Sequence, residues 1–166
     1  MHTVTNVVFA GIGGQGVLKA SDILAEAAFR SGLDVKKSEV HGMSQRGGSV
    51  TSDVRYGRRV LSPIVTPGEA DYLLVLEETQ VEPTRHYLAP HGLLVAPAVL
   101  DVSCLPSPKA LNVGMLGALS VCLQFTEADW LDALRAALPA ALHELNFRAF
   151  AVGRAAGKAA KAARSA

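Results

Sequence analysis

The stretch Gly11-Ile-Gly-Gly-Gln-Gly16 is the part of the sequence that decides the expected fold. It directly follows an apolar run at residues 4–10, which is rich in β-branched side chains and typical of a buried parallel strand. Residues 17–31 then carry apolar side chains at helical spacing, and Gly32 is a natural helix end. Because residues 34–40 have the pattern of a second strand, this region predicts a strand–helix–strand unit.

A second glycine-rich turn, residues 41–49, follows the second predicted strand. The strands of a parallel sheet end at one shared edge, where ligands bind, so we expect the two turns to meet there. Arg46 stands beside Gly47 and Gly48. Its guanidinium could donate two hydrogen bonds to a carboxylate or phosphate, while the backbone of the glycines lies against the ligand. The two turns predict a ligand site or subunit contact made of Gly11, Gly13, Gly14, Gln15, Gly16, Ser44, Gln45, Arg46, Gly47 and Gly48.

The first turn also matches the G-x-G-x-x-G spacing of dinucleotide-binding proteins. Glycines at these positions allow a tight turn and let backbone N–H groups approach a phosphate. Such a site also needs an acid near the end of the second strand, and Glu39 lies 23 residues after Gly16. The same glycines could instead serve only to make a tight turn between strand and helix, and the spacing leaves both interpretations open.

The middle of the chain predicts further strands. Residues 49–55 alternate between apolar and polar side chains and, with residues 60–65, predict an inserted hairpin. Residues 71–76 form the clearest buried strand, which ends in Glu77, and residues 92–96 predict another. We therefore expect an α/β fold: a three-layer, Rossmann-like domain with a mostly parallel sheet plus an inserted β-hairpin.

The last third of the chain is expected to be helical. Residues 112–125 are apolar around the whole helix, which predicts burial on all sides or against another chain. Thr126 and Asp129 have the spacing of a capping box for the next helix, through residue 138. We expect one domain over residues 1–153 and an alanine-rich, basic tail over residues 154–166, either a marginal helix or disordered, with a possible role as a docking arm.

Composition excludes several classes of function. The 166 residues carry a net charge of +1 and only 5% are aromatic, which argues against nucleic-acid binding. The only two cysteines, Cys104 and Cys122, are too few for an iron–sulfur cluster, which typically takes four. The first residues lack the features of a signal peptide, and no apolar run is long enough to span a membrane, so we expect a cytoplasmic protein.

Several motifs together resemble one enzyme family. They are the two glycine-rich turns, the latter with the form Glu39-Val-His-Gly-Met-Ser-Gln-Arg-Gly-Gly-Ser49, the lead Gly68-x-Ala-Asp71 into a strand ending in Glu77, Asn112 with Gly117, and Asn146-Phe-x-Ala-Phe150. In these motifs the chain resembles the gamma-type domain of the 2-oxoacid:ferredoxin (acceptor) oxidoreductases. The second turn is most similar to the small (beta) subunit of the indolepyruvate:ferredoxin branch.

The resemblance implies a subunit of a thiamine-diphosphate and iron–sulfur complex. Such a complex oxidatively decarboxylates an aryl 2-oxoacid, passes the acyl group to coenzyme A and reduces ferredoxin or another acceptor. This sequence has neither the cysteines of a cluster nor a thiamine–magnesium motif, so thiamine diphosphate, magnesium and the clusters are expected on a large partner subunit. The glycine-rich turns would then help to close the site and contact coenzyme A, or would only fit the partner.

Two other interpretations stay open from the sequence. A free-standing dinucleotide-binding protein would use Gly11, Gly13, Gly16 and Glu39, but the apolar helix 112–125 argues against it. A purely structural subunit would make no ligand contact at all.

Overall fold

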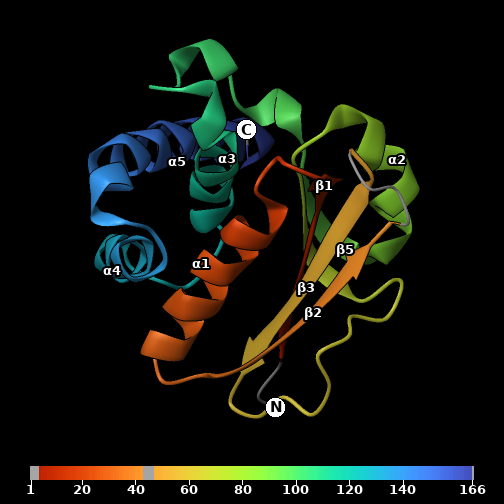
Figure 1. Ribbon diagram of the computed structural model, residues 1–166. Coiled ribbons are helices and arrows are strands. Elements are labelled where there is room, and N and C mark those ends of the chain that lie inside the picture. The colour runs from red at the N-terminus through yellow and green to blue at the C-terminus, as the bar shows by residue number, and fades with distance from the viewer. Residues whose placement is uncertain (1–3, 43–46, 166) are drawn as a thin grey trace.

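The computed structural model describes residues 4–42 and 47–165, which form a five-stranded sheet with helices (Figure 1). The sheet order is β2-β3-β1-β4-β5. β1, β4 and β5 are parallel, whereas β3 runs antiparallel to both of its neighbours, β1 and β2. Four strands therefore point the same way, and the predicted fold class is confirmed. The strands are β1 (Thr5–Ile12), β2 (Asp34–His41), β3 (Ser49–Gly57), β4 (Ala70–Val75) and β5 (Leu88–Val95).

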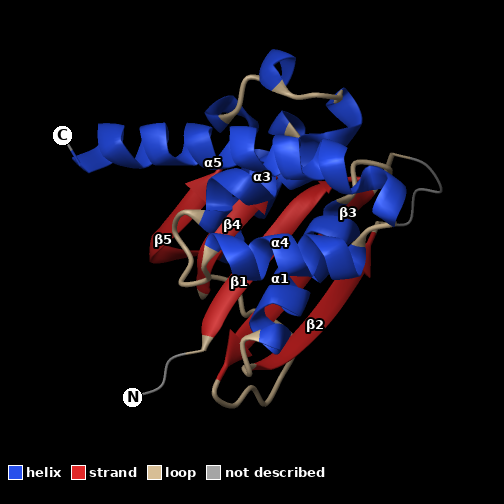
Figure 2. Ribbon diagram, turned by 90° about the vertical axis from the view of Figure 1, so that its left-hand side faces the viewer, coloured by secondary structure: helices blue, strands red, loops and turns tan. Residues whose placement is uncertain are grey.

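The two faces of the sheet are covered unequally. Four helices lie on one face, namely α1 (Val17–Arg30), α3 (Leu111–Ser120), α4 (Glu127–Ala137) and α5 (His143–Ser165) (Figures 1 and 2). The larger core, which includes the fully buried Phe9, Trp130 and Phe150, fills the space between them and the sheet. On the opposite face, the short helix α2 (Val81–Thr84), the residues after it and the irregular segment 58–69 lie over a smaller apolar cluster.

The hairpin is built from different strands than the sequence predicted. β3 pairs along its whole length with β2 on one side and with β1 on the other, so the hairpin is β2–β3. Residues 60–65, the predicted second strand, have no strand conformation. The loop of the actual hairpin is the second glycine-rich turn.

Side chains of the sheet explain why residues 60–65 need no strand partner. The Val65 N–H donates to Asp53 Oδ2 over 2.9 Å, and Arg55 Nη1 donates to the carbonyls of Ser62 (3.0 Å) and Ile64 (3.2 Å). Backbone polar groups must be paired when buried, and here carboxylate and guanidinium groups take the place of a neighbouring strand.

The C-terminal helices pack through glycines. A Cβ atom on Gly153 of α5 would lie 1.8 Å from the Gly114 carbonyl oxygen of α3, and one on Gly157 would lie 2.4 Å from that of Ala118. The backbones of α3 and α5 are therefore in direct contact at these positions. α5 continues without a break past residue 153, so residues 154–165 are helical and begin on a surface packed against α3.

The two predicted helices are both present, but α3 ends at Ser120, short of the predicted residue 125. Every residue from 112 to 120 is buried, and this burial is supplied by the chain itself. At α4, the Thr126 hydroxyl accepts from the Asp129 N–H and the Asp129 carboxylate accepts from the Thr126 N–H, which is the predicted capping box.

Candidate functional site

The two glycine-rich turns meet at the end of β1, as the sequence predicted. The Gly13 N–H donates to the Gly48 carbonyl over 2.9 Å, and the Gly42 N–H donates to the Ser49 carbonyl over 2.7 Å where β3 begins. The contact arises because β3 lies directly beside β1, which places the β2–β3 loop next to the turn that leads into α1. The first bond joins the two turns, and it occupies the amide of Gly13.

Individual glycines of the first turn are required for different reasons. Gly16 has a φ of 81°, and an added Cβ would lie 2.4 Å from Asn112 Nδ2, the same nitrogen that donates to the Gly16 carbonyl over 3.2 Å. A Cβ on Gly11 would lie 2.8 Å from Gln15 Oε1. Gly14 has a φ of 92°, which disfavours a side chain although the space around it is open. At Gly13 an added Cβ would make only ordinary contacts.

The Gln15 side chain fastens the turn to the sheet. Its Oε1 accepts from the Ile12 N–H over 3.0 Å, and its Nε2 donates to Glu77 Oε2 over 2.9 Å. Glu77 follows β4, so the carboxamide joins the ends of two parallel strands. This contact gives Gln15, which the sequence placed among the ligand-binding residues, a role in positioning the backbone of the turn.

The first turn of α1 presents unpaired donors. The first helical hydrogen bond runs from the Ala20 N–H to the Gly16 carbonyl, and no side chain caps the helix. In the described part of the chain, the amides of Gly14, Gly16 and Val17 have no hydrogen-bond acceptor. Amides at a helix N-terminus, supported by the helix dipole, are suited to bind an anion.

A hollow of about 480 Å³ lies over these donors. Its lining joins the first turn and α1 to the ends of β2 and β3, through Ile12, Gly13, Gly14, Gly16, Val17, Leu18, Lys19, Asp22, His41 and Val50. The carboxylate of Asp22 is paired with the ammonium of Lys37. The hollow therefore combines a helix N-terminus with the side chains of Lys19 and His41, and its one acid is neutralised. The ammonium group of Lys19 itself donates to the Ala137 carbonyl over 3.2 Å.

The sequence found some of these residues and missed others. Gly47, with a φ of 67°, and Gly48 lie in the turn as predicted, whereas Ser44, Gln45 and Arg46 fall outside the described residues. Lys19 and Asp22 were not proposed for the site, although their place on the first turns of α1 was a usable signal. The Asn112 contact spans 96 residues of sequence. Its signals in the sequence were a polar side chain at the start of an apolar helix and its place, with Gly117, among the motifs of the family resemblance.

The arrangement of the strands removes the basis of the dinucleotide interpretation. In a dinucleotide-binding fold the acid at the end of the second strand reaches the ribose of a cofactor bound at the first turn. Here β3 separates β2 from β1. The Glu39 carboxylate is engaged on β2 itself, 3.1 Å from Lys37 Nζ and 3.7 Å from His41 Nε2.

Comparison with known proteins identifies the family. A family model described as pyruvate ferredoxin/flavodoxin oxidoreductase matches residues 6–110. The chain belongs to this family. Indolepyruvate oxidoreductase subunit IorB of Thermococcus kodakarensis is 31% identical over 193 residues, covering 92% of this chain and 96% of that protein. The IorB subunit of Methanothermobacter thermautotrophicus is 32% identical and covers 89% of this chain and 95% of its own length. The resemblance inferred from the glycine motifs is confirmed, and the homologues are oxidoreductase subunits.

Solved structures show the same fold in this family. The gamma subunit of a keto/oxoacid ferredoxin oxidoreductase from Geobacter sulfurreducens has a TM-score of 0.69 at 25% identity, covering 93% of this chain and 99% of that one. The 2-oxoglutarate:ferredoxin oxidoreductase of Magnetococcus marinus, solved with 2-oxoglutarate, coenzyme A and succinyl-CoA bound, has a TM-score of 0.81 at 20% identity. The similarity covers 94% of this chain and 31% of the Magnetococcus chain, and it concerns the fold alone.

Two further findings bear on cofactors and location. Within residues 4–42 and 47–165, no three His, Cys, Asp or Glu side chains are grouped so that they could hold a metal ion. Among the helices of the described residues, none combines the length and the apolar character needed to cross a membrane.

Proposed function

We propose that this chain is the small subunit of a complex that oxidatively decarboxylates aryl 2-oxoacids of the indolepyruvate type. The complex would transfer the acyl group to coenzyme A and pass the electrons to ferredoxin or another acceptor. Membership of the family and the 31% and 32% identity to IorB subunits over nearly their whole length support this proposal. A cytoplasmic location is the one we expect for it.

The proposal assigns the redox cofactors to a large partner subunit. Two cysteines cannot supply the four ligands of an iron–sulfur cluster. The described residues likewise offer no grouped ligands for the magnesium ion that accompanies thiamine diphosphate. The part left to this chain is to bind and orient, and none of its residues is assigned a step in the redox chemistry.

The joined glycine turns would contact coenzyme A. The observation that carries this assignment is the set of unpaired amides at Gly14, Gly16 and Val17, which open into a hollow beside Lys19 and His41. Backbone amides and a helix N-terminus suit the phosphate groups of coenzyme A, and glycine lets them approach closely. The Magnetococcus enzyme, which has this fold, holds coenzyme A. Arg46 stays a predicted anion contact from the sequence.

Substitution of Gly13 by alanine tests this contact without disturbing the fold. Among residues 4–42 and 47–165 the added methyl group has room, because its nearest neighbours there are the Gly47 nitrogen at 3.6 Å and the Gly48 oxygen at 3.8 Å. Gly13 belongs to the lining of the hollow, so we expect the added methyl group to hinder the close approach of a phosphate. In the assembled complex, Gly13→Ala should raise the KM for coenzyme A about tenfold or more, equivalent to roughly 1.4 kcal/mol of lost binding.

Ser103→Thr provides the matched control, because it adds one methyl group at an exposed position outside the hollow. Its KM for coenzyme A should equal that of the wild type. A complex of Gly13→Ala that assembles normally with an unchanged KM would contradict the coenzyme A contact and favour a purely structural subunit. A chain that forms no thiamine-bearing complex would instead contradict the subunit assignment itself.

A further inference from the structure

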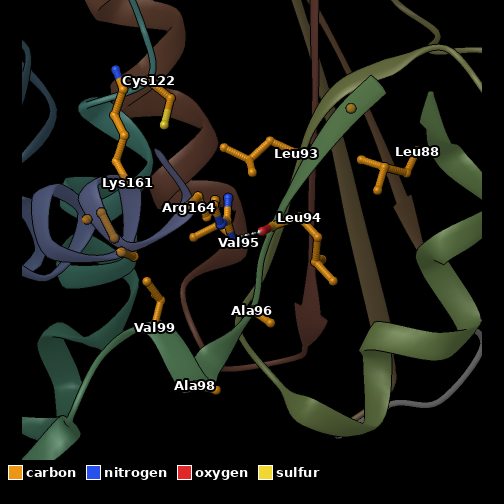
Figure 3. Close-up of a pocket in the computed structure, with 14 residues that line it drawn as sticks. Leu88, Leu93, Leu94, Val95, Ala96, Ala98, Val99, Cys122, Lys161 and Arg164 are labelled. Carbon is orange, nitrogen blue, oxygen red and sulfur yellow. Dashed lines mark hydrogen bonds between the residues drawn. The ribbon is translucent and has the colours of Figure 1, made fainter. Parts of the chain in front are cut away.

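The two edges of the sheet differ in how well they are protected against a further strand. At the β5 edge, Pro90 has no N–H to donate, and the pairing with β4 shifts in register after Ala70. Arg164 of α5 also contacts this strand, where its Nη2 donates to the Leu94 carbonyl over 3.5 Å (Figure 3). β2 forms the other edge (Figure 2), and its eight residues include no proline, no glycine and no break in register.

The outer side of β2 presents backbone donors and acceptors. At the end of the β2–β3 ladder, the Gly42 N–H donates to the Ser49 carbonyl over 2.7 Å. Because the backbone groups of successive strand residues point to opposite sides, the even-numbered residues of β2 face β3. The outward-facing residues are Val35, Lys37, Glu39 and His41. Among the residues that the structure describes, none pairs with their main-chain N–H or C=O groups, so this edge is a template for another strand.

We propose that the strand which completes this edge is β2 of a second copy of the chain. The two strands would run antiparallel about a two-fold axis at Ser38, and one continuous sheet would cross both copies. In this register Val35 lies opposite His41 of the second copy, and Lys37 lies opposite Glu39. Each of these residues would exchange two backbone hydrogen bonds with the residue opposite. The proposal goes beyond the proposed function, because it needs no large subunit.

The charges of β2 select both this partner and this register. Residues that face each other across a two-fold axis lie on the same face of the sheet, so the axis must pass beside a single residue. An axis at Lys37 would set two ammonium groups against each other, and an axis at Glu39 would do the same with two carboxylates. Like charges directly opposite are destabilising, whereas the axis at Ser38 places Lys37 opposite Glu39 twice.

The ion pairs already present within one copy fit this arrangement. Lys37 Nζ lies 3.1 Å from Glu39 Oε1 of its own strand and also contacts the carboxylate of Asp22. Two such strands in the proposed register form a square of alternating charge, in which each group has an opposite charge along its strand and another across the interface. β2 is therefore complementary to itself.

The surfaces on both faces of β2 also suit a second copy. The side chain of Val40 is 60% exposed, and Lys36 of the second copy would lie opposite it, where the aliphatic part of the lysine covers the valine. On the α1 side, the 68% exposed Phe29 lines a hollow of about 500 Å³ together with Val35 and Lys37, which leaves room for side chains of the second copy. His41 lines the hollow over the glycine turns, so the dimer would border that site.

Analytical ultracentrifugation of the isolated full-length chain tests the proposal. The wild type should show a concentration-dependent dimer. Lys37→Glu would set carboxylates against carboxylates across the interface, and Glu39→Lys would set ammonium against ammonium. Each variant should weaken dimerisation about tenfold or more, because two attractive pairs become two repulsive ones. An equimolar mixture of the two variants should dimerise again, since every charge then faces its opposite.

Lys36→Glu is the matched control. It makes the same change of charge on the same strand, but the residue opposite is the uncharged Val40 of the second copy. It should dimerise within about twofold of the wild type, and circular dichroism should show the same fold in all variants. Hydrogen exchange on the wild type needs no variant: the amides of Lys37 and Glu39 should exchange more slowly as the protein concentration rises.

Three results would overturn the proposal: a wild-type chain that stays monomeric with unchanged exchange rates, a dimer that Lys37→Glu and Glu39→Lys leave intact, or a mixture of these variants that does not dimerise. If β2 instead accepts a strand of the large subunit, the isolated wild type will be monomeric and Lys37→Glu will weaken the binding of that subunit. That result too would overturn pairing between copies, and it would leave the proposed function standing.

Discussion

Neighbouring glycines in the first turn differ in what a methyl group would meet. At Gly16 the methyl would clash with Asn112 Nδ2, and the φ of 81° already disfavours any side chain. At Gly13 the backbone is not in the left-handed region and the nearest atoms are at ordinary contact distances. Gly16 is thus needed for the fold, whereas a need for Gly13 would point to something that binds from outside.

Stability measurements on the two alanine variants test this difference. Gly16→Ala should lower the free energy of unfolding by about 2–3 kcal/mol, through overpacking and backbone strain. Gly13→Ala should change it by no more than about 0.5 kcal/mol. Urea unfolding of the isolated chain gives both values. Adding Asn112→Ala to Gly16→Ala should recover only part of the loss, because the strain in the backbone remains; full recovery would contradict the role of φ.

Asp53 is a buried carboxylate whose ionised form destabilises the fold. Desolvation by burial raises the pKa of its carboxyl above the usual value of about 3.9, although the Val65 N–H and Arg55 act in the opposite direction. An acid with a raised pKa in the folded state binds protons more readily there than in the unfolded chain. Its contribution to stability is therefore most favourable at low pH and is lost as the pH rises through the folded pKa.

Asp53→Asn should accordingly match or exceed the wild type in stability at pH 7, by about 1 kcal/mol or less. The amide oxygen can still accept from the Val65 N–H, and no charge is buried. This advantage should fade below about pH 4, where the Asp53 carboxyl of the wild type becomes protonated in both the folded and the unfolded state. Thermal unfolding at several pH values measures this trend. Asp53→Ala leaves the Val65 N–H unpaired and should lower the free energy of unfolding by about 1–3 kcal/mol. A stability advantage of Asp53→Asn that grows toward low pH would contradict this interpretation.

The irregular segment 58–69 shows where reasoning from sequence fails for an element. Val60, Ile64 and Val65 have the β-branched character of a strand, and local pattern predicted one. Their backbone groups are paired instead with the side chains of Asp34 on β2 and of Asp53 and Arg55 on β3. The alternation at residues 49–55 correctly predicted a strand, but strand partners depend on tertiary packing, and the insertion of β3 between β1 and β2 has no local signal.

The sequence left two interpretations of residues 154–166 open, a marginal helix or a disordered tail, and residues 154–165 are helical. Glycine lowers helix propensity, and this segment contains Gly153 and Gly157. In the structure these glycines are the points at which α5 touches the backbone of α3. Close helix packing and helix termination use the same residue, and the sequence alone does not distinguish them.

Substitutions in α5 distinguish a packed helix from a loose tail by the sign of their effect. On helix propensity alone, Gly153→Ala should stabilise by about 1 kcal/mol. Because the new Cβ would lie 1.8 Å from the Gly114 carbonyl oxygen, we expect a loss of about 2–3 kcal/mol instead. Ala155→Gly at the exposed neighbouring position should lose only about 1 kcal/mol. Chemical unfolding gives both values, and a gain for Gly153→Ala would show that α5 is not held against α3.

The site as a unit was half predictable. A glycine turn after a parallel strand, and a second polar turn after the next predicted strand, were enough to expect that Gly13 and Gly48 would lie close together. The roles of Gln15 and Asn112 needed the structure, since their partners come from β4 and from the chain 96 residues away. The hollow beside the turns depends on how residues from separate elements face one another, which no pattern in the sequence reports.

In the whole molecule, the joined glycine turns place unpaired backbone amides beside a hollow. Under the proposed function, this surface helps to complete the active site of a partner subunit. Because the redox cofactors are assigned to that partner, we expect activity only in the complex.

The most direct test is to purify the tagged chain from its native cell and analyse what accompanies it. Visible absorbance, thiamine analysis and reduction of ferredoxin by an aryl 2-oxoacid in the presence of coenzyme A would be measured on the same sample. The account predicts a brown complex with a larger, thiamine-bearing subunit and activity that requires coenzyme A. A colourless protein that purifies alone and binds a nucleotide unaided would contradict it.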